Sequence, residues 1–135
     1  MALKITLKPH ERLIIGGAVI ANGGTRSDLV VENNVPILRE KDIMSLKDAD
    51  SPCRRIYYAI QLMYVDDKSM AEHHKLYWEL VRDVVKAAPS TTGLLNEISE
   101  HILHGRHYQA LKLTRKLINY EQEVMNHVRD ANASL

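Results

Sequence analysis

The basic side chains best suited to bind an anionic ligand cluster in the carboxyl-terminal third of the chain. No Asp or Glu occurs between Glu100 and Glu121. The interval contains four basic residues, Arg106, Lys112, Arg115 and Lys116. On a helix, residues 112, 115 and 116 share one face because they are three and four positions apart. Such a face suits a phosphate backbone or an acidic protein partner, and a basic face turned only to solvent is the alternative.

A second group of candidate ligand-binding residues combines arginines with tyrosines. Arg54 and Arg55 precede Tyr57 and Tyr58, and such a cluster could stack on unpaired RNA bases. In the competing interpretation, one tyrosine packs in the core and the arginines pair with Asp48 or Asp50. Residue types alone leave both interpretations open.

Metal binding and catalysis find little support in the sequence. His101, His104 and His107 are spaced by three residues, but Gly105 is expected to break the helix between them. The chain contains no Gly-x-Ser-x-Gly elbow, Walker loop or His-Glu-x-x-His helix. We therefore expect neither an enzyme nor a protein with a cofactor.

The composition is that of a folded chain without a dominant charge. Among 135 residues, 18 Lys and Arg oppose 17 Asp and Glu, and 45% are hydrophobic. This balance excludes indiscriminate coating of nucleic acid, although binding through a local patch remains open. Cys53 has no partner for an intramolecular disulfide, and no apolar run approaches the length of a membrane span. We expect a cytoplasmic protein without a membrane partner.

The first 45 residues are typical of a small sheet. Apolar runs at residues 3–7, 13–15, 18–20, 29–31 and 36–39 predict five short antiparallel strands connected as a meander. Gly16 and Gly17 between two of the runs predict a hairpin. A sheet of this size buries too little apolar area to be stable alone, so helices or a second copy should cover it.

Residues 46–135 have helical periodicity and predict a four-helix bundle, which makes the fold class α+β. The helices are expected at about 52–65, 69–88, 91–104 and 108–128. Ser51 followed by Pro52 predicts the first helix start, and Ser69 with Glu72 forms a capping-box pattern at the second. The last helix has apolar residues on a wide face, as expected of a helix at the bundle centre or at an oligomer interface.

The order of motifs along nearly the whole chain resembles the FlbT family of flagellar-biosynthesis regulators. The resemblance rests on LKPHERLIIGGAVIANGG, LREKDIM, SPCRRIYYAIQLMY and ILHGRHYQALKLTRKLINYE. It implies a post-transcriptional regulator that associates with the 5′ untranslated region of flagellin mRNA and represses translation or promotes decay. Some members of the family activate flagellar genes instead.

The first 45 residues are also similar to the carbon-storage-regulator family of RNA-binding proteins. The similarity rests on the strand spacing, on ERLIIG at 11–16 and on LREKDI at 38–43. It implies an intertwined dimer in which Arg39 of the fifth strand and Ile5 of the first contact RNA. The first-strand arginine of that family falls on Leu7, which departs from the pattern, and Lys8 follows it.

Two functional hypotheses emerge. In the first, a homodimeric mRNA-binding regulator uses Arg39, Lys8 and Lys4, with Arg54, Arg55 and the basic residues from Arg106 to Lys116 as a second surface. In the second, the helices form an adaptor that binds flagellin or another flagellar regulator and acts on mRNA indirectly.

Overall fold

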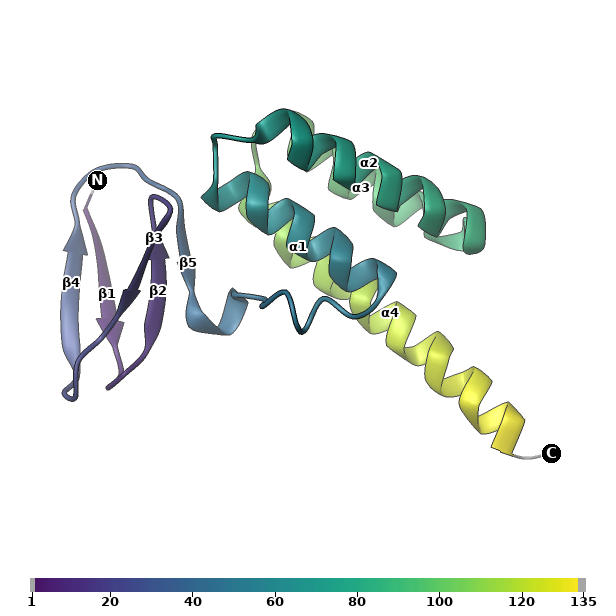
Figure 1. The fold of residues 1–135 in the computed structure, drawn as a ribbon, viewed down its shortest axis with the longest axis horizontal. Coiled ribbons are helices and arrows are strands. Elements are labelled where there is room, and N and C mark those ends of the chain that lie inside the picture. Colours follow the sequence, from purple (N-terminus) through teal and green to yellow (C-terminus); the bar gives the residue numbers. More distant parts are fainter. Residues whose placement is uncertain (1, 134–135) are drawn as a thin grey trace. The chain divides into compact units, whose positions relative to one another are not determined.

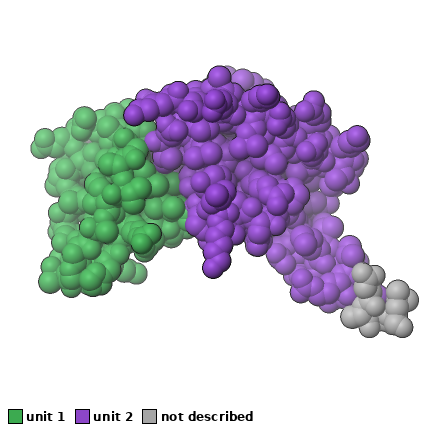
Figure 2. All heavy atoms as spheres, viewed as in Figure 1, with its two compact units in different colours: residues 1–43 green, residues 44–135 purple. Residues whose placement is uncertain are grey.

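The protein consists of one unit of strands and one of helices. A computed structural model describes residues 2–133, with side chains to residue 131. The chain divides into two compact units, Met1–Ile43 and Met44–Leu135 (Figure 2). All strands lie in the first unit and all four α-helices in the second (Figure 1), which confirms the α+β class.

The five predicted strands are all present in the first unit. They are β1 (Leu3–Leu7), β2 (Arg12–Ile15), β3 (Ala18–Ala21), β4 (Ser27–Val31) and β5 (Ile37–Arg39), followed by the short 3₁₀ helix η1 (Glu40–Asp42). They form two antiparallel sheets, one of β1 and β4 and one in the order β3-β2-β5. The predicted meander is therefore wrong, since β1 pairs with β4 and β5 pairs with β2.

The turns explain this connectivity. Gly16 and Gly17 have φ values of 55° and 86° and close the predicted hairpin between β2 and β3. Asn22 then redirects the chain, because its side-chain amide donates to the carbonyl oxygens of Lys8 at 2.8 Å and Thr25 at 2.9 Å. These bonds tie the start of the β3–β4 connection to the end of β1, so β4 returns alongside β1.

The core of the strand unit comes from alternate residues of facing strands. Ile5, Leu7 and Leu13 are buried. Four half-buried side chains pack around them, Ile15, Leu29, Val31 and Ile37. The period-2 pattern of β1 therefore marks the buried face correctly.

The helical unit contains α1 (Pro52–Val65), α2 (Met70–Ala87), the 3₁₀ helix η2 (Pro89–Thr91), α3 (Thr92–Leu103) and α4 (His107–Ala133). Helix α1 packs against α2 and α4, and α3 packs against α4. Gly105, at φ 73°, separates α3 from α4 as predicted. Between residues 2 and 133, no helix combines the length and hydropathy needed to cross a bilayer.

Of the two predicted helix caps, the one at Ser51 is confirmed and the one at Ser69 is wrong. The Ser51 hydroxyl accepts a hydrogen bond from the Arg54 backbone amide at 3.2 Å, which confirms the cap of α1. The capping box at Ser69 is wrong, because Ser69 has ψ 40° and its side chain makes no capping bond. Asp66 orders this turn instead, accepting from the Lys68 amide at 3.1 Å and lying 3.2 Å from His73 Nε2.

Candidate functional site

Basic and aromatic side chains of α1 and α4 meet along one line of contacts. We call Tyr57, Tyr64, Tyr108, Lys112 and Arg115 the basic seam. The Arg115 guanidinium lies 4.8 Å from the centre of the Tyr57 ring, and its Nη2 donates to the Tyr57 hydroxyl at 3.2 Å. Tyr57 is buried, so this contact attaches the exposed Arg115 side chain to a residue of the helical core.

The other end of the seam repeats the pairing of a cation with a ring. The Lys112 ammonium lies 4.9 Å from the centre of the Tyr108 ring, one turn earlier on α4. Tyr108 in turn packs against Tyr64, with ring centres 6.3 Å apart. Since Tyr57 lies beside Arg115 and Tyr64 beside Tyr108, α1 and α4 run antiparallel along the seam.

The basic side chains in the first half of α4 lie at the surface. Lys112, Arg115 and Lys116 are all exposed. No ion pair found among residues 2–131 includes Lys112 or Lys116. Arg106 donates from Nε to His101 Nδ1 at 3.0 Å. The predicted stretch thus presents positive charge at its surface, anchored on tyrosines of two helices.

For the cluster at the start of α1, the packing interpretation holds for two of its residues. Arg54 forms an ion pair with Asp50 at 2.9 Å. Tyr57 is 1% exposed and has no face available for base stacking. Arg55 remains exposed and Tyr58 is half-buried.

In the strand unit, Arg39 links β5 to β1. Its Nη2 donates to the Thr6 carbonyl oxygen at 2.7 Å and to Glu11 Oε2 at 3.3 Å. Glu11 also accepts a hydrogen bond from the Lys8 amide at 2.9 Å, and this bond, with the Arg39 interaction, lowers the pKa of the Glu11 carboxyl. The Arg39 guanidinium therefore already has an anionic partner.

The other strand residues predicted to contact RNA differ in their exposure and in their neighbours. Ile5 is 4% exposed and belongs to the core, so its side chain is not accessible to a ligand in this fold. Lys4 lies 3.6 Å from Asp28, with both side chains exposed. Lys8 is exposed at the rim of a cavity of about 650 Å³ whose charged lining includes both acidic and basic groups.

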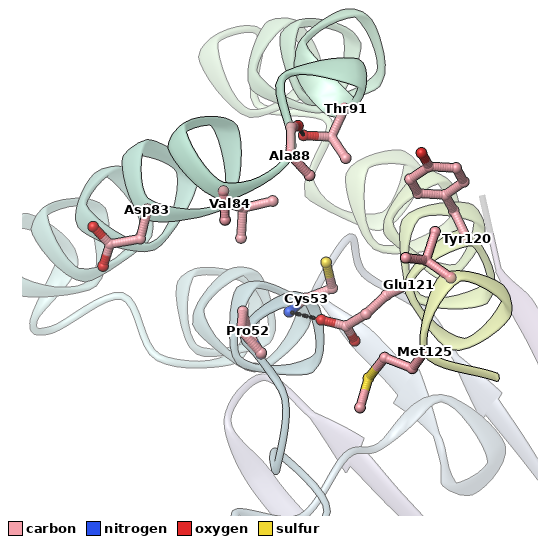
Figure 3. Close-up of a pocket in the computed structure, with 11 residues that line it drawn as sticks. Pro52, Cys53, Asp83, Val84, Ala88, Thr91, Tyr120, Glu121 and Met125 are labelled. Atoms are coloured by element: carbon pink, nitrogen blue, oxygen red, sulfur yellow. Dashed lines mark hydrogen bonds between the residues drawn. The ribbon is translucent and has the colours of Figure 1, made fainter. Parts of the chain in front are cut away.

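An apolar groove lies elsewhere in the helical unit and was not predicted from the sequence. It has a volume of about 210 Å³ and lies between the start of α1, the end of α2 and the second half of α4 (Figure 3). Its α4 wall includes Tyr120, Val124 and Met125, which are 40%, 44% and 51% exposed. The wide apolar face of α4 gave the only indication of such a surface.

Glu121 closes the floor of the groove by binding the start of α1. Its Oε1 accepts from the Ser51 hydroxyl at 2.5 Å. Its Oε2 accepts from the Cys53 backbone amide at 3.1 Å (Figure 3). A carboxylate at this position also complements the positive end of the α1 dipole. Burial, together with the nearby Glu121 charge, raises the pKa of the Cys53 thiol to about 12, so the thiol is protonated at neutral pH.

The histidines considered for metal binding do not form such a site in the described chain. Between residues 2 and 131, no three His, Cys, Asp or Glu side chains come together as metal ligands would. His107 Nε2 is buried without a hydrogen-bond partner among these residues. Burial, and then the proximity of His74, lowers the pKa of His107.

Comparison with known proteins links the chain to flagellar proteins. The family model described as "Flagellar protein FlbT" matches residues 3–125. The chain is 46% identical to "Probable flagellum biosynthesis repressor protein FlbT 1" of Bradyrhizobium diazoefficiens, over 92% of this chain and 85% of the relative. It is 36% identical to "Flagellum biosynthesis repressor protein FlbT" of Caulobacter vibrioides, over 95% of this chain and 92% of the relative. No solved structure is significantly similar.

Proposed function

The chain belongs to the FlbT family, and we propose that it regulates flagellum biosynthesis by binding the 5′ untranslated region of flagellin mRNA. Binding would repress translation or promote decay of the message. The names of its relatives describe repressors of flagellum biosynthesis, which supports a regulator rather than an enzyme.

The observation that carries this proposal is the exposed basic face of α4 beside the seam. Lys112 and Lys116 are one turn apart on α4, and the chain has no carboxylate side chain from residue 101 to 120. Lysines in such a position bind phosphate without strong competition from neighbouring acids. The half-buried rings of Tyr64 and Tyr108 lie alongside, and tyrosines at a basic surface suit the stacking of unpaired bases.

Arg39 is a weaker candidate than the α4 lysines for the main RNA contact. An incoming phosphate would compete with the Glu11 carboxylate, 3.3 Å from the guanidinium. Lys8 lies beside the same carboxylate, which its backbone amide binds. We therefore assign the strand residues Arg39, Lys8 and Lys4 a supporting part, with α4 as the principal surface.

A mobility-shift titration with a flagellin leader tests the proposal. The double variant Lys112→Ala/Lys116→Ala should weaken binding and make log Kd less steeply dependent on log salt concentration. The matched control is Lys75→Ala/Lys86→Ala, which removes two exposed lysines from α2 and should leave binding unchanged. Absence of binding below micromolar concentration, or binding insensitive to salt, would contradict direct RNA recognition.

The adaptor hypothesis is the second candidate, and the exposed apolar side chains of α4 favour it. Val124, Met125 and Val128 are 44%, 51% and 53% exposed, and such side chains suit a protein partner better than RNA. An adaptor predicts a stable complex with flagellin or another flagellar regulator that survives nuclease and high salt. A direct RNA-binding protein predicts that nuclease releases its partners.

A further inference from the structure

We propose that the apolar groove and the second half of α4 form an interface with a second copy of this chain. In this arrangement, α4 of each copy lies antiparallel to α4 of the other and enters the other's groove. The proposal concerns a surface separate from the basic seam, so it goes beyond the proposed function and can fail independently of it.

The exposed apolar residues of α4 form a continuous stripe. Tyr120, Val124 and Val128 follow one another at intervals of four residues, and Met125 lies beside them. All four are at least 40% exposed. Earlier on α4, Leu111 and Leu117 are buried within the unit, so the stripe continues the core-facing side of the helix beyond its intramolecular partners.

The length of α4 explains why the stripe lacks a partner within the chain. With 27 residues, α4 is about 40 Å long, nearly twice the length of the 14-residue α1. Glu121 already contacts Ser51 and Cys53 at the beginning of α1, so later residues of α4 extend past it (Figure 1). A protruding helix of about 12 residues is only marginally stable in water, and packing its stripe against another helix would stabilise it.

Two observations favour a second copy as that helix. The groove and stripe share Tyr120, Val124 and Met125, so one patch supplies both sides of a two-fold interface. The charges also complement each other in the antiparallel direction. Asp83 and Glu121 line the groove, and Arg129 lies beyond Met125 towards the other end of the stripe.

The antiparallel direction brings Arg129 of each copy towards Asp83, which lines the apolar groove of the other copy. A parallel pair would instead place the two Glu121 carboxylates at the same level. Arg129 follows Met125 by four residues and so lies at the edge of the stripe, whereas the helical period places Asp130 on the opposite side of α4. The Asp130 charge therefore lies away from the proposed contact.

Sedimentation velocity of the nuclease-treated full-length protein tests the interface. The wild type should be a dimer, and Val124→Asp/Val128→Asp should be a monomer with an unchanged far-UV circular dichroism spectrum. The control Leu103→Asp alters a leucine of α3 that is 66% exposed and should leave the dimer intact. A wild type that stays monomeric at about 100 μM would exclude a dimer of useful affinity and overturn the proposal.

A charge-reversal series tests the predicted direction even if the apolar variant fails to fold. Arg129→Glu should weaken dimerisation about tenfold, corresponding to about 1.4 kcal/mol, and adding Asp83→Arg should restore it. A dimer that neither the apolar nor the charge variants affect would show that another surface is used. A monomer whose groove variants lose binding to purified flagellin would assign the groove to that protein and likewise contradict self-association.

Discussion

Basic residues occur in both units, but their surroundings differ. In the strand unit, Arg39 and Lys4 face the carboxylates of Glu11 and Asp28. In α4, Lys112 lies over the ring of Tyr108 and Arg115 over the ring of Tyr57. A ring orients a cation without cancelling its charge, whereas a carboxylate neutralises it.

The comparison shows that a match to a known RNA-binding pattern does not by itself indicate available charge. Arg39 occupies the position that the resemblance marks for RNA, yet it connects β5 to β1. Lys112 and Lys116 lie outside the part of the chain that resembles the carbon-storage regulators, but their surroundings favour anion binding. We therefore expect substitutions in the strand unit to change mainly stability and those on the face of α4 to change mainly binding.

The largest loss of stability is expected at Tyr57, the buried residue of the basic seam. Tyr57→Ala removes a buried ring and the support of Arg115, so it should lower the free energy of unfolding by about 3–5 kcal/mol. Tyr57→Phe keeps the ring and loses only the hydroxyl that accepts from Arg115, at a cost of about 1 kcal/mol. Urea denaturation measures both. Equal losses for the two variants would mean that the hydrogen bond, and not the ring, anchors the seam.

Arg39→Ala should have the next largest effect on stability. It removes the bonds to Thr6 and Glu11. Because the side chain is 41% exposed, we expect a loss of about 1–2 kcal/mol, below the full value of a buried charged hydrogen bond. Thermal denaturation followed by circular dichroism gives the change. Arg39→Lys retains the charge without the two-point geometry and serves as the comparison.

Arg39→Ala can also contradict the expectation that the strand unit contributes mainly to stability and α4 mainly to binding. If Arg39→Ala keeps wild-type stability but abolishes binding to a flagellin leader, then Arg39 serves RNA recognition and the carboxylate partner does not limit it. The same result would restore the RNA-binding site that the similarity to the carbon-storage regulators implies for the strand unit.

Much of the fold follows from local sequence patterns. Period-2 runs marked all five strands, Gly16 and Gly17 marked the hairpin, and Ser51 with Pro52 marked the start of α1. The strand pairing could not be predicted in the same way. The pairing involves a hydrogen bond from the Asn22 side-chain amide to the carbonyl oxygen of Lys8, which is distant in sequence. The residue type at a turn does not indicate which carbonyl group its side chain will bind.

The candidate site was predictable in part for a similar reason. An acid-free interval in the sequence located the basic residues of α4. The contacts of Arg115 with Tyr57 and of Glu121 with Ser51 join positions 58 and 70 residues apart. Only the packing of α1 against α4 creates them, so sequence spacing gave no indication of the seam or of the floor of the groove.

The two units should also respond to acid at different pH values. His107 has a pKa below its usual value of 6.5, so below pH 6.5 the unfolded state binds more protons than the folded state. The stability of the helical unit should therefore fall as the pH drops below 6.5. Glu11 has a pKa below 4.5, so its contribution to the strand unit is present above pH 4.5 and lost as the pH falls further.

Fluorescence of the single tryptophan, Trp78 on α2, follows unfolding of the helical unit across this range. His107→Phe removes the titrating group and should flatten the dependence of stability on pH below 6.5. His127→Phe, an exposed histidine near the end of α4, is the control. An unchanged profile in His107→Phe would show that another group causes the loss.

The smallest effect on stability is expected from the lysines proposed to bind RNA. Lys112→Ala and Lys116→Ala alter exposed side chains outside any ion pair found between residues 2 and 131, so each should change the free energy of unfolding by less than about 0.5 kcal/mol. Each should nevertheless reduce the slope of log Kd against log salt by about 1. Fluorescence anisotropy with a labelled leader measures that slope. A slope unchanged by either substitution, with weaker binding in Lys4→Ala, would reverse the contrast and place the phosphate contacts in the strand unit.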